Sequence, residues 1–185
     1  MEQRHNPKSE QYASHHMVEF IASLESEDEL PSFPNKVDLI CKGPWKTPYM
    51  CDIDGMVVGK KISVVGIPDK KAARFHINLM CSRKKASGDI ALHFNPRFKI
   101  NSVVVCNSRV GGQYKREQRP SAKFPFHHGE RFKLDVVCHM GHFEVFVNET
   151  LYTMYSYHIH DLSSVTVLNI EGDVSICSVE GCGLK

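Results

Sequence analysis

Residues 132–147 read FKLDVVCHMGHFEVFV and contain two short runs in which apolar side chains occupy every second position. The first run is Phe132, Leu134, Val136 and Cys138, and the second is Phe143, Val145 and Val147. Successive side chains of a β-strand point to opposite faces, so this period of two predicts strands with one buried face. The stretch therefore predicts two strands of a sheet.

The same period recurs along most of the chain after residue 60. It is found at Ile62/Val64, Phe75/Ile77/Leu79, Val103/Val105 and Val165/Val167. Turn-forming residues separate the runs, as in Ser87-Gly88-Asp89, Gly111-Gly112 and Glu171-Gly172-Asp173. Many short strands without a long helix among them favour an all-β, two-sheet antiparallel sandwich. The 185 residues, 42% of them hydrophobic, are enough to bury one sizeable core.

A polar row accompanies one of the predicted strands, in Ala91-Leu92-His93-Phe94-Asn95-Pro96-Arg97-Phe98. If residues 91–98 form a strand, His93, Asn95 and Arg97 share one face, and Leu92, Phe94 and Phe98 share the other. An imidazole, an amide and a guanidinium suit a ligand rich in hydroxyl groups better than a hydrophobic one. The row indicates a sugar-binding surface.

At these residues the chain resembles the galectins, whose signature has three parts. The sequence carries them in order as His93-Phe94-Asn95-Pro96-Arg97, Val105-Cys106-Asn107 and Tyr114-Lys115-Arg116-Glu117-Gln118-Arg119. The resemblance extends from about Pro44 to the C-terminus. It implies a jelly-roll-like sandwich, similar also to legume lectins, that binds β-galactosides of the lactose or N-acetyllactosamine type on glycoproteins or glycolipids without catalysis.

The resemblance also implies a role for each matching residue. The strand residues His93, Asn95 and Arg97 would bind the axial C4 hydroxyl that distinguishes galactose from glucose. A glucose-type hydroxyl would leave these groups unpaired, at a cost of roughly 1–3 kcal/mol. Asn107 and Glu117 would hold the C6 hydroxyl.

The third part of the signature departs from the family at one position. The family has a tryptophan where this chain has Tyr114, which would lie under the sugar ring and stack over a smaller area. Glu117 would pair with Arg97 and Arg119 and fix both guanidinium planes. We therefore expect the family's sugar specificity with lower affinity.

Two other functions compete with the lectin. A galectin-like protein with weak or altered sugar binding, because of Tyr114, would act through protein contacts. A glycosidase would need two carboxylates flanking the scissile bond, and Glu117 is the only one in the signature. Its arginine partners would keep it ionised, the wrong state for a general acid. We expect no enzyme, no cofactor and no metal, since the His and Cys residues lack familiar zinc-ligand spacing.

The first 39 residues differ from the remainder, residues 40–185, which we predict to be the carbohydrate-recognition domain. Residues 1–39 hold three Lys or Arg against eight acids, a net of minus five. Met17, Phe20 or Ile21, and Leu24 recur at helical spacing before Pro31. This segment predicts an acidic extension that contains a short amphipathic helix, or is irregular, followed by a linker.

The segment Lys60–Arg119 is basic, with fourteen Lys or Arg against three acids, a net of plus eleven. The excess charge is either a solvated rim or a surface that favours sulfated or sialylated galactosides. Nucleic acid fits less well, since the cluster lacks interleaved aromatics and no nucleic-acid motif is present.

The cellular location is predicted from what the sequence lacks. It has no apolar run long enough to span a membrane, and its first residues lack the apolar core of a secretory signal. Seven cysteines without close-paired spacing indicate mostly free thiols. We expect a cytoplasmic protein, which the resemblance extends to export without a signal peptide. A homodimer is left open.

Overall fold

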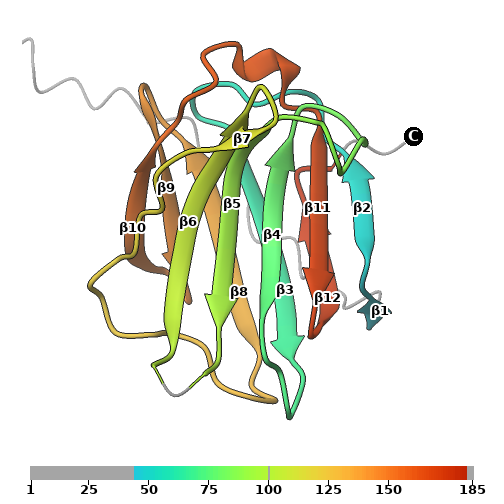
Figure 1. Cartoon of the computed structure of the whole chain (residues 1–185). Helices are drawn as coiled ribbons and strands as arrows, with labels where there is room; N and C mark the ends of the chain where they lie inside the picture. The colour runs from blue at the N-terminus through green and yellow to red at the C-terminus, as the bar shows by residue number, and fades with distance from the viewer. Residues whose placement is uncertain (1–43, 100, 183–185) are drawn as a thin grey trace, which may run out of the picture. The chain divides into compact units, whose positions relative to one another are not determined.

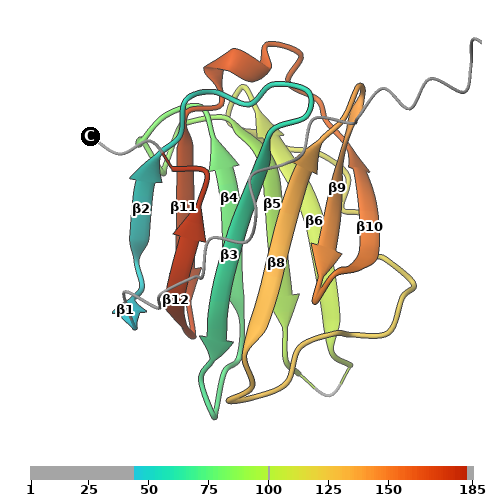
Figure 2. The same ribbon diagram turned by 180° about the vertical axis from the view of Figure 1, so that it is seen from behind.

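The computed structural model describes residues 44–99 and 101–182, which form two antiparallel sheets of six strands each. One sheet has the order β1-β12-β3-β8-β9-β10, and the other has the order β2-β11-β4-β5-β6-β7. Figure 1 views the chain from the side of the β5 sheet, and Figure 2 views it from the side of the β3 and β8 strands. The predicted all-β sandwich is confirmed.

The strands are short, as the spacing of the apolar runs predicted. Their bounds are β1 Trp45–Lys46, β2 Tyr49–Asp52, β3 Lys61–Pro68, β4 Phe75–Met80, β5 Ile90–Arg97, β6 Val103–Val110, β7 Gln113–Tyr114, β8 Phe132–Cys138, β9 His142–Val147, β10 Thr150–Ser156, β11 Val167–Gly172 and β12 Val174–Glu180. The described helical structure is one 3-10 turn, Leu162–Ser164.

The alternating runs of residues 132–147 become β8 and β9, and their apolar side chains enter the core. Leu134, Val136 and Phe143 are at most 1% exposed. The two strands pair directly, with Cys138 opposite Phe143 and Leu134 opposite Val147. Burial of apolar surface contributes roughly 25 cal/mol per Å², so these positions contribute strongly to the stability of the sandwich.

Aromatic rings join the two sheets. Phe75 of β4 stacks on Phe132 of β8 with ring centroids 5.4 Å apart, and Phe126 meets both rings edge-on at 5.4 and 5.1 Å. Offset and edge-on contacts of this kind add to the stabilisation from burial alone. Because Phe75 precedes the polar positions of β4, the cluster also anchors the strand that lies beside the candidate site.

Two predictions need adjustment. Val165 lies outside β11, which begins at Val167 after the 3-10 turn. Cys51 and Cys182 form a disulfide across 131 residues of sequence, whereas Cys81, Cys106 and Cys138 are free thiols. Sequence spacing could not reveal the pair, because the sandwich brings their Cα atoms within 6.2 Å. The predicted extension, residues 1–39 with its helix, lies outside the described residues and stays a prediction.

Candidate carbohydrate-binding site

The polar row of β5 lies on the face of its sheet that points away from the core. Leu92 and Phe94 are buried in the core, at 1% and 0% exposure, so the alternate residues His93, Asn95 and Arg97 project outward together. Cross-strand pairing places His93 opposite Asn78 of β4 on one side and Asn107 of β6 on the other. The predicted row is therefore extended sideways across three strands.

Asn95 is 3% exposed, and its amide fixes its neighbours. Its Nδ2 donates to the carbonyl oxygen of Phe75 at 2.5 Å, and its Oδ1 accepts from Arg97 Nε at 2.7 Å. The guanidinium is thus held by a buried partner two residues back on the same strand. Preorganisation of this kind reduces the entropy cost of binding a ligand.

Glu117 joins two arginines, as predicted. Its carboxylate accepts from Arg119 Nη2 at 2.8 Å and lies 3.6 Å from Arg97 Nη2. The hydrogen bond from Arg119, together with the charge of Arg97, lowers the pKa of Glu117, so the group stays ionised. A line of alternating charge, Arg97–Glu117–Arg119, follows the outer face of the sheet.

Backbone pairing holds this segment beside β6. Gln118 N and O bond to Cys106 O and N at 2.9 and 2.8 Å, and the Gln118 side chain donates to the Met154 carbonyl at 2.8 Å. Residues 117 and 119 flank Gln118 and therefore share the face opposite to its side chain. This pairing brings the third part of the signature to the strands that carry the first two.

Asn107, which was predicted to hold the C6 hydroxyl, is largely buried. It is 5% exposed, and its Oδ1 accepts from the backbone N–H of Ser108 at 2.8 Å. The Nδ2 amide has no partner within residues 44–99 and 101–182. It is therefore the half of this side chain that can donate to a ligand.

Tyr114 forms an exposed platform, with 54% of its surface accessible. Gly111 and Gly112, both at positive φ, make the tight turn that pairs β7 with β6 and sets Tyr114 opposite Arg109. The Arg109 guanidinium lies 5.6 Å from the centre of the tyrosine ring, and the His93 ring meets it edge-on at 6.0 Å. Arg109 itself donates to the carbonyls of Lys85 and Gly88 at 2.5–2.9 Å. These hydrogen bonds fix the guanidinium beside the tyrosine ring.

His93 is uncharged in this setting. Burial, together with the neighbouring His76 and Arg97, lowers the pKa of His93 to about 4. Its Nδ1 lies 2.6 Å from Asn78 Oδ1, and an amide oxygen can only accept, so Nδ1 donates. The ring is neutral and oriented across the strand pair.

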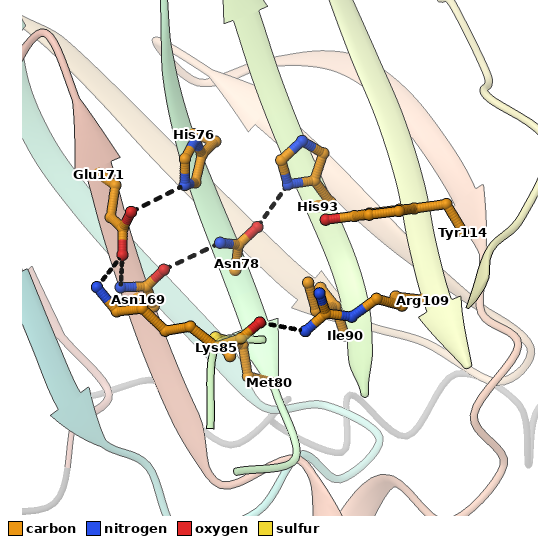
Figure 3. Close-up of a pocket in the computed structure, with 10 residues that line it drawn as sticks. All are labelled: His76, Asn78, Met80, Lys85, Ile90, His93, Arg109, Tyr114, Asn169 and Glu171. Atoms are coloured by element: carbon orange, nitrogen blue, oxygen red, sulfur yellow. Dashed lines mark hydrogen bonds and ion pairs between the residues drawn. The ribbon is translucent and has the colours of Figure 1, made fainter. Parts of the chain in front are cut away.

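A pocket of about 160 Å³ opens beside His93 and Tyr114 and extends toward β4 and β11 (Figure 3). It is lined by His76, Asn78, Met80, Lys85, Ile90, His93, Arg109, Tyr114, Asn169 and Glu171. A second pocket of about 340 Å³ lies at the Arg97 end of the row, lined by Ala73, Arg74, Arg97 and Lys99. The two pockets differ in chemistry, because the first contains both Lys85 and Glu171, whereas three cations line the second.

Residues 48–181 match the family model described as galactoside-binding lectin. This chain belongs to the galectins. It is 34% identical over 139 residues to "Galectin-3" of Oryctolagus cuniculus, which covers 74% of this chain and 55% of the relative. It is 34% identical over 137 residues to the "32 kDa beta-galactoside-binding lectin" of Haemonchus contortus, covering 74% of this chain and 46% of the relative.

Solved structures give the same result for the fold. The crystal structure of Caenorhabditis elegans galectin LEC-6 superposes with a TM-score of 0.64 and 32% identity, covering 74% of this chain and 91% of that one. Sheep Galectin-11 in complex with glycerol, at 22% identity and a TM-score of 0.65, supports the fold alone. This galectin chain spans about half the length of the curated relatives it matches.

The galectin signature did not include every residue that builds this surface. Asn78, Arg109, Asn169 and Glu171 were missed, although each is a polar residue within or beside a strand whose alternate positions are apolar. Counting polar residues on the outer face of every strand would have found them. Among the residues that the structure describes, no cluster of His, Cys, Asp or Glu could hold a metal ion, and no helix could cross a membrane.

Proposed function

We propose that this galectin domain binds β-galactosides of the lactose or N-acetyllactosamine type on glycoproteins or glycolipids, and does not catalyse a reaction. The residues that would contact the sugar are His93, Asn95, Arg97, Asn107, Tyr114, Glu117 and Arg119. The observation that carries the proposal is the continuous line from buried Asn95 through Arg97 to Glu117 and Arg119. The proposal is supported by two relatives, from Haemonchus contortus and Caenorhabditis elegans, that are named as β-galactoside-binding lectins.

Selectivity for galactose over glucose follows from this line. Arg97 and the one remaining amide hydrogen of Asn95 donate, and His93 is neutral, so an axial hydroxyl above β5 would find both donors and an acceptor. An equatorial hydroxyl points elsewhere and leaves these groups unpaired. The loss is roughly 1–3 kcal/mol for each partly buried group, enough to separate the two epimers.

A glycosidase is disfavoured by the ionisation of both carboxylates near the row. The hydrogen bond from Arg119 lowers the pKa of Glu117, and the hydrogen bond from Lys85 lowers the pKa of Glu171. Cleavage of a glycosidic bond needs one carboxyl group that is protonated near neutral pH. Neither group meets that requirement.

Isothermal titration with lactose tests the proposal. We expect saturable binding to the wild-type chain, none to Arg97→Ala, and none with cellobiose, in which a glucose replaces the galactose. Arg116→Ala is the matched control, since Arg116 is an exposed arginine between Tyr114 and Glu117 and outside the row. No heat at tens of millimolar lactose would overturn the proposal, since that concentration corresponds to only ~2–3 kcal/mol of affinity.

The competing function, a domain that acts through protein contacts, predicts a different competition result. Binding to a glycoprotein should then persist in excess lactose and survive Arg97→Ala. Displacement by lactose supports the lectin. We also propose a cytoplasmic location with export independent of a signal peptide. The free thiols of Cys81, Cys106 and Cys138 support the cytoplasmic location, and the Cys51–Cys182 disulfide fits an exported form in an oxidising environment. Cell fractionation tests the location, and sedimentation tests whether a homodimer forms.

The second pocket refines the prediction of anionic glycans. Arg74, Arg97 and Lys99 line it without a carboxylate among the lining residues, whereas in the first pocket Lys85 is neutralised by Glu171. We propose that a sulfate or carboxylate on the galactoside is favoured on the side of Arg74. The interaction is partly exposed, so salt should screen it.

A further inference from the structure

A chain of hydrogen bonds crosses three strands and ends at His93 (Figure 3). Cross-strand register sets Asn169 of β11 opposite Asn78 of β4, and Asn78 opposite His93 of β5. Glu171 lies two residues beyond Asn169 and therefore on the same face. The galectin signature contains neither Asn169 nor Glu171.

The chain of bonds has a fixed direction because it begins at groups that can only accept. The Lys85 ammonium keeps Glu171 ionised, so its carboxylate can accept but cannot donate. Asn169 Nδ2 donates to Glu171 Oε1 at 3.2 Å and lies 3.5 Å from the Tyr49 carbonyl oxygen, which is also an acceptor. The Asn169 amide therefore turns its nitrogen toward these two oxygens.

The orientation of the Asn169 amide then fixes the orientation of the Asn78 amide. Asn169 Oδ1 accepts from Asn78 Nδ2 at 3.0 Å, which leaves Asn78 Oδ1 facing His93 Nδ1 at 2.6 Å. Asn169 and Asn78 are 2% and 5% exposed. Reversing either amide would set oxygen against oxygen in a place that water scarcely reaches, so one orientation is favoured.

We propose that Asn169 and Glu171 are positioning residues that hold His93 in the tautomer with hydrogen on Nδ1, so that Nε2 is free to accept a hydrogen bond from a sugar hydroxyl. This inference rests on the proposed function. His76, Arg97, Arg109 and Glu117 also surround the ring, but none of them forms a hydrogen bond with it among the described residues. The tautomer is set from β11, through Asn78.

A consequence for specificity follows. A hydroxyl that accepts from Arg97 must also donate to His93 Nε2, so the site requires a group that does both. A fluorine in place of that hydroxyl is similar in size but cannot donate. A 4-deoxy-4-fluoro galactoside should therefore bind about tenfold more weakly than methyl β-galactoside.

The direct test is the nitrogen-15 NMR spectrum of the His93 ring at about pH 8, where the shifts of the two nitrogens identify the tautomer. We expect hydrogen on Nδ1 in the wild-type chain and a mixture in Asn169→Leu, which removes the acceptor for Asn78. Methyl β-galactoside should bind Asn169→Leu about three- to tenfold more weakly. The double variant Asn169→Leu/Asn78→Asp should restore both, because an aspartate beside His93 can only accept.

Two further variants keep the test decisive. Glu171→Leu removes the first acceptor at a partly exposed position and should shift the tautomer if buried Asn169→Leu fails to fold. Met80→Leu alters the apolar lining of the same pocket and should leave the tautomer unchanged. Hydrogen on Nε2 in the wild-type chain, or an unchanged tautomer in both Asn169→Leu and Glu171→Leu, would overturn the inference. Absence of galactoside binding to the wild-type chain would overturn the proposed function instead, since the NMR result does not depend on a ligand.

Discussion

The two ends of the candidate site are built in opposite ways. At the β5 end, Asn95, Asn78 and Asn169 are buried and their amides bond to one another, to backbone or to His93. At the other end, Tyr114 and the side chain of Arg119 are more than half exposed, and Arg119 is held by an ion pair with water-accessible Glu117. One end is fixed by the fold, whereas the other lies on its surface.

This difference assigns different tasks to the two ends. A buried polar group that loses its partner costs roughly 1–3 kcal/mol, whereas an exposed ion pair is worth only about 0–1 kcal/mol. Changes at the β5 end should therefore alter stability and recognition together. Changes at the Tyr114 end should alter affinity and leave the fold intact.

The largest effect is expected for Asn95→Ala. The substitution leaves the Phe75 carbonyl without its partner and releases Arg97 Nε, so we expect a loss of about 1–3 kcal/mol of stability and more than about 100-fold in lactose affinity. Urea unfolding and calorimetric titration measure the two quantities. The matched change at the other end, Glu117→Ala, should weaken binding with less than about 1 kcal/mol of destabilisation. Equal destabilisation by both would erase the contrast between the ends.

A smaller effect is expected at the platform. Tyr114→Ala should lower lactose affinity about tenfold, and Tyr114→Trp should raise it about two- to tenfold, because a larger ring covers more of the sugar. Tyr114→Phe keeps the ring area and should stay within about twofold of wild type if the ring face makes the contact. Titration of all three variants with lactose distinguishes an effect of ring area from an effect of the phenol hydroxyl of Tyr114. No gain from tryptophan would mean that stacking area does not limit affinity.

A weaker effect is expected in the basic pocket. Arg74→Ala should reduce the preference for sulfated over neutral lactose about two- to threefold at low salt, and the difference should vanish near 0.5 M salt. Competition assays with sulfated lactose isomers measure it. Lys84→Ala, an exposed cation outside that pocket, is the control. A preference that resists salt would contradict an exposed, screened contact.

The smallest effect on lactose binding is expected when the pH is lowered from neutral. The pKa of His93 is about 4 in the folded chain, so binding should stay level from about pH 8 to 5.5 and fall about twofold near pH 4. In the unfolded chain the same histidine takes up its proton near pH 6.5, so folding stability should begin to fall below about pH 6.5 and level off below about pH 4. Titrations and unfolding curves across this range separate the two. A midpoint of binding near pH 6.5 would mean that His93 is solvated rather than held.

Alternation and signature together predicted the sandwich, the outward row of β5 and the Arg97–Glu117–Arg119 line. Alternation succeeded for the sandwich and the row because it depends on residues close in sequence and on the fixed geometry of a strand, whereas the Arg97–Glu117–Arg119 line was predicted from the resemblance to the galectins. Val103 and Val105 show the limit of alternation. Both lie on the face that carries Asn107, and their neighbours Val104 and Cys106 fill the core.

The missed residues depend on register between distant strands. Asn169 and Asn78 are 91 positions apart, and nothing in the sequence states that β11 pairs with β4. The Cys51–Cys182 bond was missed for the same reason. A one-residue slip in either register would turn these side chains to the other face, so three-dimensional pairing was needed to find them.

The register of β11 beside β4 has a practical meaning for protein engineering. Residues 93–119 contain all seven signature side chains, and they could be grafted as one block onto another β-sandwich. Such a transplant would carry the proposed sugar contacts but leave behind Asn78, Asn169 and Glu171. The histidine of the transplant could carry its proton on either ring nitrogen. A graft that preserves the tautomer must therefore include the matching positions of β4 and β11 as well as those of β5.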